Sequence, residues 1–388
     1  MLYLQEHHHM IRETVRGFVK DVIAPRAKEI DKSCEFPADT LKQMAELGLL
    51  GVPFPEEYGG AGMDNLAQAI VIEEIARDCA STALTIAAHV SLGTYPIFAF
   101  GTEEQKRRWV PKLASGQMIG AFGLTEPGAG SDAQGIRTTA VRDGAHFVVN
   151  GSKMYCTNGG YAGTIVFTAV TGQKAGGRPE ITAFVVEKGT PGLVAGKQEK
   201  KLGMHASDTR MMHFEDCRVP IENVLGGLDQ VGVGFSNFMK TLEGGRIGIG
   251  ALGVGCAAGA LDRALPYAKD RKAFGGPISD QQGIAFKLAD MAMWVEAGRH
   301  LVYHAAMLKD QGKPYSREAS MAKLFATEAA CKWSAETVLL HGSRGYSNER
   351  PVERHFRDAP GLRIYEGTSQ VQRIVIAREI LGREEKTT

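Results

Sequence analysis

Apolar residues recur at helical spacing through the first part of the chain. Ile11, Val15, Phe18 and Val22 lie about one helical turn apart, which predicts an amphipathic helix. We expect Pro25 to end this helix, because proline lacks a backbone donor and clashes with the preceding turn.

Two further helices are marked by their starts and stops. Pro37 is expected to begin a helix that Gly48 ends. Thr102 and Gln105 have the spacing of a capping box, in which each side chain satisfies a backbone donor of the other residue. We therefore predict an α-helical N-terminal domain over residues 1–120.

The pattern changes at residue 121 to short alternating runs rich in Gly, Thr and Val. Turn dipeptides stand at Asp143-Gly144 and Asn150-Gly151. Because no long helical pattern separates these runs, we predict an antiparallel barrel or sandwich as the middle domain, over residues 121–232. The predicted strands are 138–141, 147–149, 164–169 and 182–186.

Helical spacing returns at residue 233, and the helices are long. Residues 279–311 contain no proline and would span about 50 Å as a helix. Ser279 to Gln282 has the form of a second capping box, and residues 317–341 predict another long helix. Such helices need neighbours along their length, so we predict an α+β multidomain chain whose residues 233–388 form a four-helix-bundle domain with subunit contacts.

Composition narrows the classes of function. A chain of 388 residues with a net charge of +1 offers no electrostatic basis for binding nucleic acid or an anionic membrane. No apolar run approaches the roughly 20 residues that cross a bilayer, and the first residues lack a signal-peptide pattern, so we expect no membrane insertion. The six cysteines are far apart and predict free thiols in a reducing compartment, either the cytoplasm or, for a processed eukaryotic protein, the mitochondrial matrix.

Two motif matches are better explained by packing. Gly248, Gly250 and Gly253 match a dinucleotide fingerprint, but they lie inside a predicted helix instead of between a strand and a helix. We expect these glycines to allow close contact between helices. His300 and His304 have the spacing of metal ligands on a helix but lack the usual glutamate and a third ligand, so no metal is expected.

The loop from Leu124 to Asp132 holds Gly and Pro turn-formers together with hydroxyl and carboxylate groups. Such a loop exposes backbone N–H groups, and the hydroxyls of Thr125 and Ser131 could donate hydrogen bonds to a ligand. On residue types alone, a surface turn and a binding loop are equally consistent with this segment.

Six segments, taken together and in order, resemble the acyl-CoA dehydrogenase family, and in particular its short-chain, butyryl-CoA dehydrogenase-like members. The resemblance spans nearly the whole chain. It implies an FAD-dependent enzyme that assembles as a homotetramer, a dimer of dimers. The segments are 122–132, 153–159, 242–246, 271–275 followed by Gln282, 351–359 and 364–368.

The resemblance implies that several parts of the chain hold FAD. Phe122, Leu124 and Thr125 would line the isoalloxazine ring, Thr125 and Thr157 would hydrogen-bond its polar edge, and Tyr155 would pack against it. The other implied cofactor contacts are Ser131, Cys156, Arg271, Phe274, Gln282, Leu339, Gly342, Ser343, Thr368 and Gln370. Among these, Arg271, Phe274 and Gln282 would reach the FAD of a neighbouring subunit, with Arg271 pairing with the pyrophosphate.

The resemblance also implies the chemistry, which is α,β-dehydrogenation of an acyl-CoA thioester. Glu366 would remove the α-proton while a β-hydride moves to the flavin, and its backbone N–H would hold the thioester carbonyl. Burial should raise the pKa of Glu366 toward the working pH. Some relatives carry the base at the position of Gly245, which cannot serve here. Substrate contacts are implied for Ser131, Glu243, Arg246 and Gly367.

One loop departs from the family pattern. Relatives usually carry Gln-Ile-His-Gly-Gly-x-Gly-Tyr where this chain has residues 339–346. Leu339 cannot make the hydrogen bond of the glutamine. Ser343 and Arg344 alter a loop that is expected to approach the FAD pyrophosphate, where Arg344 is a candidate phosphate partner.

More than one function is compatible with this resemblance. The leading one is a dehydrogenase that acts on short-chain or branched short-chain acyl-CoA and passes electrons to an electron-transfer flavoprotein. The alternatives are a flavin oxidase or monooxygenase, a dehydrogenase for acyl-carrier-protein thioesters, and a non-catalytic flavin- or acyl-binding protein. Leu84, which stands where glutaryl-CoA enzymes would carry an arginine, disfavours a dicarboxylyl substrate.

Overall fold

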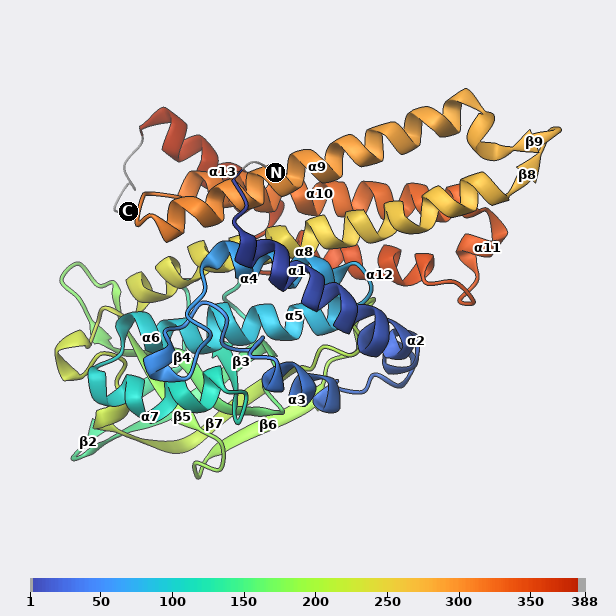
Figure 1. Ribbon diagram of the computed structural model, residues 1–388. Helices are drawn as coiled ribbons and strands as arrows, with labels where there is room; N and C mark the ends of the chain where they lie inside the picture. The colour runs from blue at the N-terminus through green and yellow to red at the C-terminus, as the bar shows by residue number, and fades with distance from the viewer. Residues whose placement is uncertain (1–2, 383–388) are drawn as a thin grey trace.

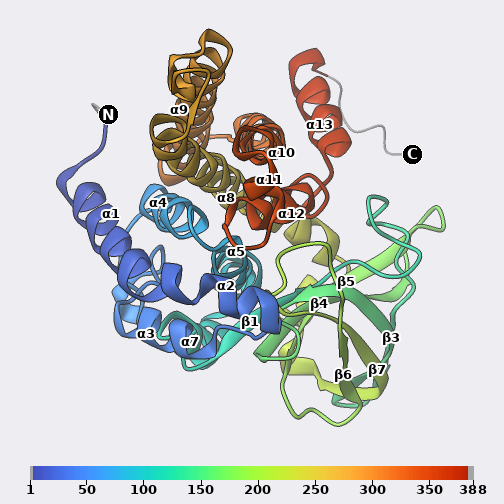
Figure 2. The ribbon, with the colours of Figure 1, turned by 90° about the vertical axis from the view of Figure 1, so that its right-hand side faces the viewer.

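Helical periodicity at the start of the chain produces a layer of helices. The computed structural model describes residues 3–382, and its N-terminal helices lie beside the sheet and below the C-terminal helices (Figure 1). They are α1 (Glu6–Phe18), α2 (Ala24–Ser33), α3 (Ala38–Glu46), α4 (Asn65–Ala76), α5 (Ala80–Ala88), α6 (Tyr95–Phe100) and α7 (Glu103–Ala114). α5 lies between the other N-terminal helices, the sheet and the C-terminal helices (Figure 2).

The prediction that Pro25 ends the first helix is wrong. A π-helical turn, Val19–Ile23, carries the chain directly from α1 into α2. Pro25 then occupies the first turn of α2, where a missing backbone donor costs little. The predicted capping box is confirmed, because the hydroxyl of Thr102 accepts from the backbone N–H of Gln105 at 3.2 Å and the side chain of Gln105 accepts from the Thr102 N–H at 3.1 Å.

The alternating runs form one curved sheet. Its strands are β1 (Ile119–Gly123), β2 (Thr139–Asp143), β3 (His146–Thr157), β4 (Ala162–Gln173), β5 (Pro179–Glu187), β6 (Leu193–Gln198) and β7 (Thr209–Pro220). Most neighbouring strands are antiparallel, as predicted. The antiparallel prediction is wrong for two pairings: β1 pairs with β4 in parallel, and β2 meets β4 in parallel at its first residue, Thr139. The β2–β3 hairpin lies between β1 and β4 in the chain and provides the crossover that a parallel pair requires.

The C-terminal part is built from helices, of which the first three are long. They are α8 (Gly234–Asp270), α9 (Gln282–Asp310), α10 (Ser316–His341), α11 (Ser343–Tyr346), α12 (Val352–Leu362) and α13 (Ser369–Leu381). A short hairpin of β8 (Lys272–Ala273) and β9 (Gly276–Pro277) connects α8 to α9. α10 packs along both α8 and α9, which gives the predicted bundle.

The second predicted capping box is wrong. Ser279 lies in a 3-10 turn, Ile278–Asp280, before the helix. α9 begins three residues later, and Gln281 at its N-cap makes no side-chain capping bond. The ends of the helices agree better with the sequence, since Gly312 and Gly342 follow α9 and α10 with φ angles of 65° and 60°.

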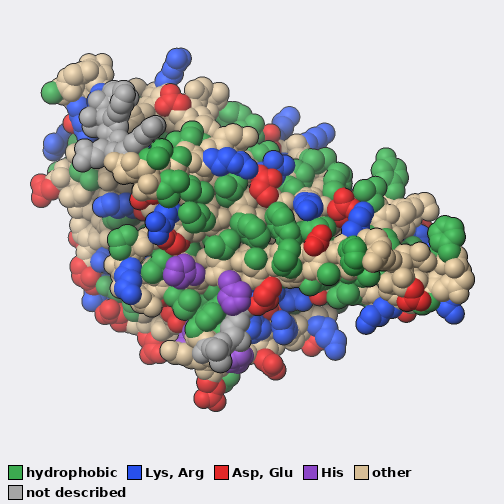
Figure 3. All heavy atoms as spheres, turned by 90° about the horizontal axis from the view of Figure 1, so that it is seen from above, with side chains coloured by type: hydrophobic (Ala, Val, Ile, Leu, Met, Phe, Trp, Pro, Cys, Tyr) green, Lys and Arg blue, Asp and Glu red, His purple; other side chains and the backbone are tan. Residues whose placement is uncertain are grey.

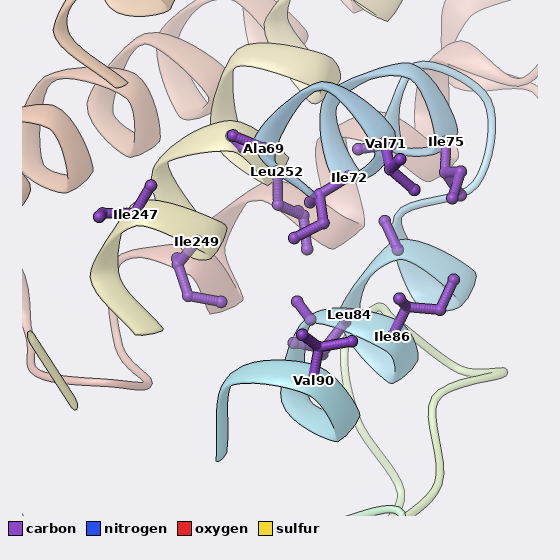
Figure 4. Packing of buried hydrophobic residues seen from close by; sticks show 14 of the residues in the cluster. Ala69, Val71, Ile72, Ile75, Leu84, Ile86, Val90, Ile247, Ile249 and Leu252 are labelled. Carbon is purple, nitrogen blue, oxygen red and sulfur yellow. The ribbon is translucent and has the colours of Figure 1, made fainter. Parts of the chain in front are cut away.

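The core between α4, α5 and α8 is made of aliphatic side chains from all three helices. Ile72 of α4 and Leu252 of α8 both point from their helices toward α5 in it (Figure 4). The glycine motif lies inside α8 and allows close packing there, because a Cβ at Gly253 would lie 2.9 Å from the backbone of Ala326. Two stretches, Ala80–Phe100 and Gly234–Asp270, are long and apolar enough to cross a membrane, but 72% and 94% of their most apolar windows are buried inside the protein, as in core helices.

Candidate active site

The turn between α12 and α13 presents Glu366 in an unusual backbone conformation. Glu366 has a φ angle of 53° and Gly367 a φ angle of 93°. The first is a left-handed conformation that a residue with a Cβ adopts only at a cost, so surrounding contacts must hold it. Thr368 then caps α13 by accepting a hydrogen bond from the backbone N–H of Val371.

Two side chains hold this turn by its carbonyl groups. Lys323 of α10, which is 1% exposed, donates from Nζ to the carbonyl oxygen of Tyr365 at 2.7 Å and also to that of Gly367. Gln372 donates from Nε2 to the carbonyl oxygens of Gly367 at 2.8 Å and Glu366 at 3.3 Å. The sequence reasoning missed both residues. The sequence does carry one sign of a buried lysine at this place: Lys323 lies on a helix face whose other residues, Ala319, Ala322 and Ala326, are small and apolar.

The Glu366 carboxylate points against helix α8 at Gly245. A Cβ built on Gly245 would lie 2.2 Å from Oε2 of Glu366, so a side chain at position 245 and this carboxylate would compete for the same space. Oε2 is buried and has no hydrogen-bond partner among residues 3–382. Burial raises the pKa of Glu366 to about 7, although the positive charges of Lys323 and Arg246 oppose this shift.

Arg246 and Glu243 lie one helical turn or less from Gly245. Arg246 is 7% exposed and donates from Nη1 to the hydroxyl of Ser320 at 3.2 Å, while its Nε is buried and unpartnered within the described chain. Glu243 lines a cleft of about 620 Å³ whose other walls are residues 312–318 and Glu379. Arg246 is therefore close enough to interact electrostatically with both the predicted base Glu366 and Glu243, while Glu243 lines a cleft of its own.

A buried ion pair fixes the loop that follows β1. Nζ of Lys153 lies 2.6 Å from Oε1 of Glu126, and neither side chain is more than 6% exposed. Glu126 also accepts from the backbone N–H groups of Arg137 and Thr138, which ties both ends of the loop to one carboxylate. The sequence reasoning included both members of the pair in its motifs but assigned neither of them this role.

The residues predicted to surround a flavin ring suit such a group. Tyr155 is 60% exposed and has a φ angle of 54°, which turns an aromatic ring outward from β3. The hydroxyls of Thr125 and Thr157 have no hydrogen-bond partner in the described part of the chain. Phe122 stacks on Phe238 of α8 with ring centroids 4.2 Å apart. Hydroxyls without partners and an exposed aromatic ring are groups that suit the polar edge and flat face of a flavin.

Three other predicted contacts of this group differ in exposure. Leu124 is 9% exposed, and Ser131 lies exposed on the loop. The Cys156 side chain is fully buried in the core of the sheet, so only its backbone is available to a ligand. The predicted cofactor contact of Cys156 would therefore be made by its backbone, because alternate residues of a strand face opposite sides.

The second predicted group of cofactor contacts lies at the far end of the helical hairpin. α8 has 37 residues and reaches about 55 Å from the region of the sheet to the β8–β9 hairpin (Figure 1). Phe274, with a φ angle of 50°, is 96% exposed at this tip. The tip group consists of Arg271, Phe274, Gln282, Leu339, Gly342 and Ser343, all of them exposed. The residues predicted to surround the flavin ring, here called the ring group, are Phe122, Leu124, Thr125, Tyr155 and Thr157. One chain does not bring the tip group and the ring group together.

A cluster of metal-ligand residues near the N-terminus is explained by hydrogen bonding. Ligand atoms of His7, His8 and Asp64 lie within 4.8 Å of one another. Nδ1 of His8 accepts from the backbone N–H of Gln5, so the proton of a neutral ring must sit on Nε2, which faces Asp64 at 3.0 Å. Nε2 is then a donor to the carboxylate and not a free ligand. Asp64 also caps α4.

The chain matches three family models in order. They describe the N-terminal domain of acyl-CoA dehydrogenases over residues 5–117, the middle domain over 121–217 and the C-terminal domain over 232–381. The human short-chain specific mitochondrial acyl-CoA dehydrogenase is 48% identical over 97% of this chain and 91% of its own length.

Two solved structures are similar over almost their whole length. Butyryl-CoA dehydrogenase from Megasphaera elsdenii superposes with a TM-score of 0.94 at 42% identity, covering 97% of this chain and 99% of that one. A chain from a structure of the electron transferring flavoprotein of Acidaminococcus fermentans, studied for flavin-based electron bifurcation, gives a TM-score of 0.95 at 46% identity, covering 99% and 100%.

The raised pKa of Glu366 can be tested by infrared titration. Burial disfavours the charged form, so we expect the side chain to be protonated at pH 5.5 and to lose its proton as the pH rises through about 7. The difference spectrum of wild type minus Glu366→Gln should then lose a protonated carboxyl band across this range. A group already ionised at pH 5.5 would contradict the expected titration.

Proposed function

Because this chain belongs to the acyl-CoA dehydrogenase family, we propose that it oxidises short-chain acyl-CoA thioesters, straight or branched, to 2-enoyl-CoA with FAD as cofactor and Glu366 as base. The observation that carries the proposal is the buried, unpartnered Oε2 of the half-buried Glu366 side chain, which lies against Gly245. A carboxylate with a pKa of about 7 can hold or release a proton near neutral pH, which suits a general base.

Glu366 and Arg246 each have a task in the proposed mechanism. The backbone N–H of Glu366 would donate to the thioester carbonyl, which stabilises the negative charge that develops as the α-proton leaves. The carboxylate of Glu366 would take that proton, and little water would compete with the substrate for this carboxylate. FAD, when bound, supplies the acceptor for the β-hydride. Arg246, whose guanidinium is buried nearby, would favour the charged form of the base before the transfer.

FAD binding would require two chains. The ring group holds Phe122, Leu124, Thr125, Tyr155 and Thr157, and the tip group holds Arg271 and Phe274 at the other end of α8. A homotetramer supplies such pairs of chains. Figure 3 shows hydrophobic side chains spread across the face seen from above. Phe286 and Met293 belong to α9, the helix at the top of Figure 1, and are 61% and 58% exposed. Burial of this face between subunits would remove that apolar area from water.

The preference for short chains is supported by a cavity that reaches α8 at Gly244, the neighbour of Gly245 in the chain. A cavity of about 100 Å³ lies between α4, α8 and the segment after α5, and Gly244 and Gly248 form its α8 wall. Its far walls include Gln68, whose amide nitrogen and oxygen are buried without partners, and Lys309, whose pKa burial lowers to about 8. A long apolar chain would cover these polar groups without satisfying them, which is unfavourable.

The same proposal includes an electron-transfer flavoprotein as the electron acceptor and a reducing compartment as the location. The chain similar to this one in the structure from Acidaminococcus fermentans supports the acceptor. The six cysteines are all free thiols, which suits the cytoplasm or, in a eukaryote, the mitochondrial matrix.

The base assignment is tested by anaerobic flavin bleaching. Wild-type enzyme mixed with butanoyl-CoA should lose its yellow colour, and Glu366→Gln should keep bound flavin but bleach at least 10²-fold more slowly, the lower end of a typical general-base contribution. Glu104→Gln, an exposed change on α7, is the matched control. No bleaching of the wild type by any acyl-CoA would refute the proposed function, and rapid peroxide formation in air would identify an oxidase.

The chain-length preference is tested with a panel of acyl-CoAs. We expect kcat/KM to fall from butanoyl- to hexadecanoyl-CoA, because longer chains must bury the unpartnered amide of Gln68. Gln68→Leu should improve the longer substrates relative to butanoyl-CoA, while Gln43→Leu, on the exposed face of α3, should change nothing. Glutaryl-CoA belongs in the panel because Lys309 provides a cation that position 84 lacks. A wild type that prefers hexadecanoyl-CoA, or the glutaryl thioester, would contradict the short-chain assignment.

A further inference from the structure

The ammonium group of Lys323 binds the same peptide unit that is to hold the substrate. The carbonyl of Tyr365 and the backbone N–H of Glu366 belong to one peptide group, and Nζ of Lys323 lies 2.7 Å from that carbonyl oxygen. A cation that hydrogen-bonds to a peptide oxygen withdraws electron density from the amide, which makes the N–H at its other end a stronger donor.

Lys323 also fixes where that N–H points. It donates to the carbonyl oxygens on both sides of Glu366, those of Tyr365 and Gly367. Glu366 has a left-handed φ angle of 53°, so the direction of its N–H depends on contacts that keep the turn in this conformation. Gln372 shares this task at Gly367 but carries no charge.

A purely structural role accounts poorly for a lysine at this place. Lys323 is 1% exposed, and desolvation lowers its pKa to about 8, so burying the charged form is unfavourable. No carboxylate lies within salt-bridge distance of Lys323 in the described chain, and the partners of Nζ are the two carbonyl oxygens. A neutral donor such as a glutamine amide could bridge carbonyl groups without burying a charge.

We infer that Lys323 is a positioning residue that orients and polarises the Tyr365–Glu366 peptide, so that the Glu366 N–H can stabilise the enolate-like charge on the substrate's carbonyl oxygen. This inference rests on the proposed function. The substrate's carbonyl oxygen gains negative charge as the α-proton moves to Glu366, and the positive charge of Lys323 acts on that oxygen through the peptide. Lys323 itself neither gives nor takes a proton.

The test measures carbonyl polarisation directly. Butanoyl-CoA labelled with ¹³C at the thioester carbonyl is bound to FAD-loaded Glu366→Gln enzyme, which cannot remove the α-proton, and the carbonyl stretch is read by isotope-edited infrared spectroscopy. We expect a lower frequency than in free butanoyl-CoA, and we expect Lys323→Met in the same background to restore most of the free value. Lys42→Met, on the exposed face of α3, is the control and should have no effect.

Kinetics of variants that keep Glu366 separate the effect of the Lys323 charge from the effect of holding the turn in place. Lys323→Met should lower kcat by about 10²-fold, the loss typical of one oxyanion donor, with a much smaller change in KM. Gln372→Leu removes an uncharged clamp from the same turn and should cost less. Should Lys323→Met fail to fold, Lys323→Gln keeps a donor without the charge and serves both measurements.

Two outcomes would overturn the inference while leaving the proposed function intact. One is an unchanged carbonyl frequency when the charge at position 323 is removed. The other is a kcat within twofold of wild type in an enzyme that butanoyl-CoA still bleaches. A wild type that no acyl-CoA bleaches would refute the proposed function itself, so the two failures are distinguishable.

Discussion

The burial of one carboxylate oxygen, Oε2 of Glu366, against a glycine is the constraint on which the rest of the site depends. Glu366 can press its Oε2 against α8 only because Gly245 has no side chain, and burial there raises its pKa to about 7. The left-handed turn that delivers Glu366 is held by Lys323 and Gln372 from two other helices. The strained backbone of Glu366, the buried cation of Lys323 and the absent side chain of Gly245 therefore together hold the carboxylate in one position.

The long helix α8 connects this geometry to the rest of the molecule. Gly245 lies near its start, its middle packs against α4 and α10 through other glycines, and its end leads into the exposed hairpin with Phe274. A chain with two incomplete groups of cofactor contacts, separated by this helix, fits an enzyme whose sites form between subunits.

Much of this could be predicted from local signals. The family resemblance is confirmed, and the capping box at Thr102 and the glycine motif of α8 follow from short-range physics. The prediction at Pro25 failed because a π-helical turn, Val19–Ile23, precedes the proline and continues the helix into α2. The parallel pairing of β1 depends on a strand far away in the sequence. Lys323 was missed for the same reason: its partners lie 42 and 44 residues later, and nothing beside it in the sequence indicates them.

A side chain at position 245 and the Glu366 carboxylate would occupy the same space beside the substrate. The most direct measurement compares turnover of butanoyl-CoA by Glu366→Gly with that of the double variant Glu366→Gly/Gly245→Glu. Since the Cβ of residue 245 would lie where the Glu366 carboxylate now sits, the second carboxylate should recover a measurable part of the lost rate. A double variant no faster than Glu366→Gly, with FAD still bound, would show that a carboxylate at position 245 does not reach the place of the Glu366 carboxylate.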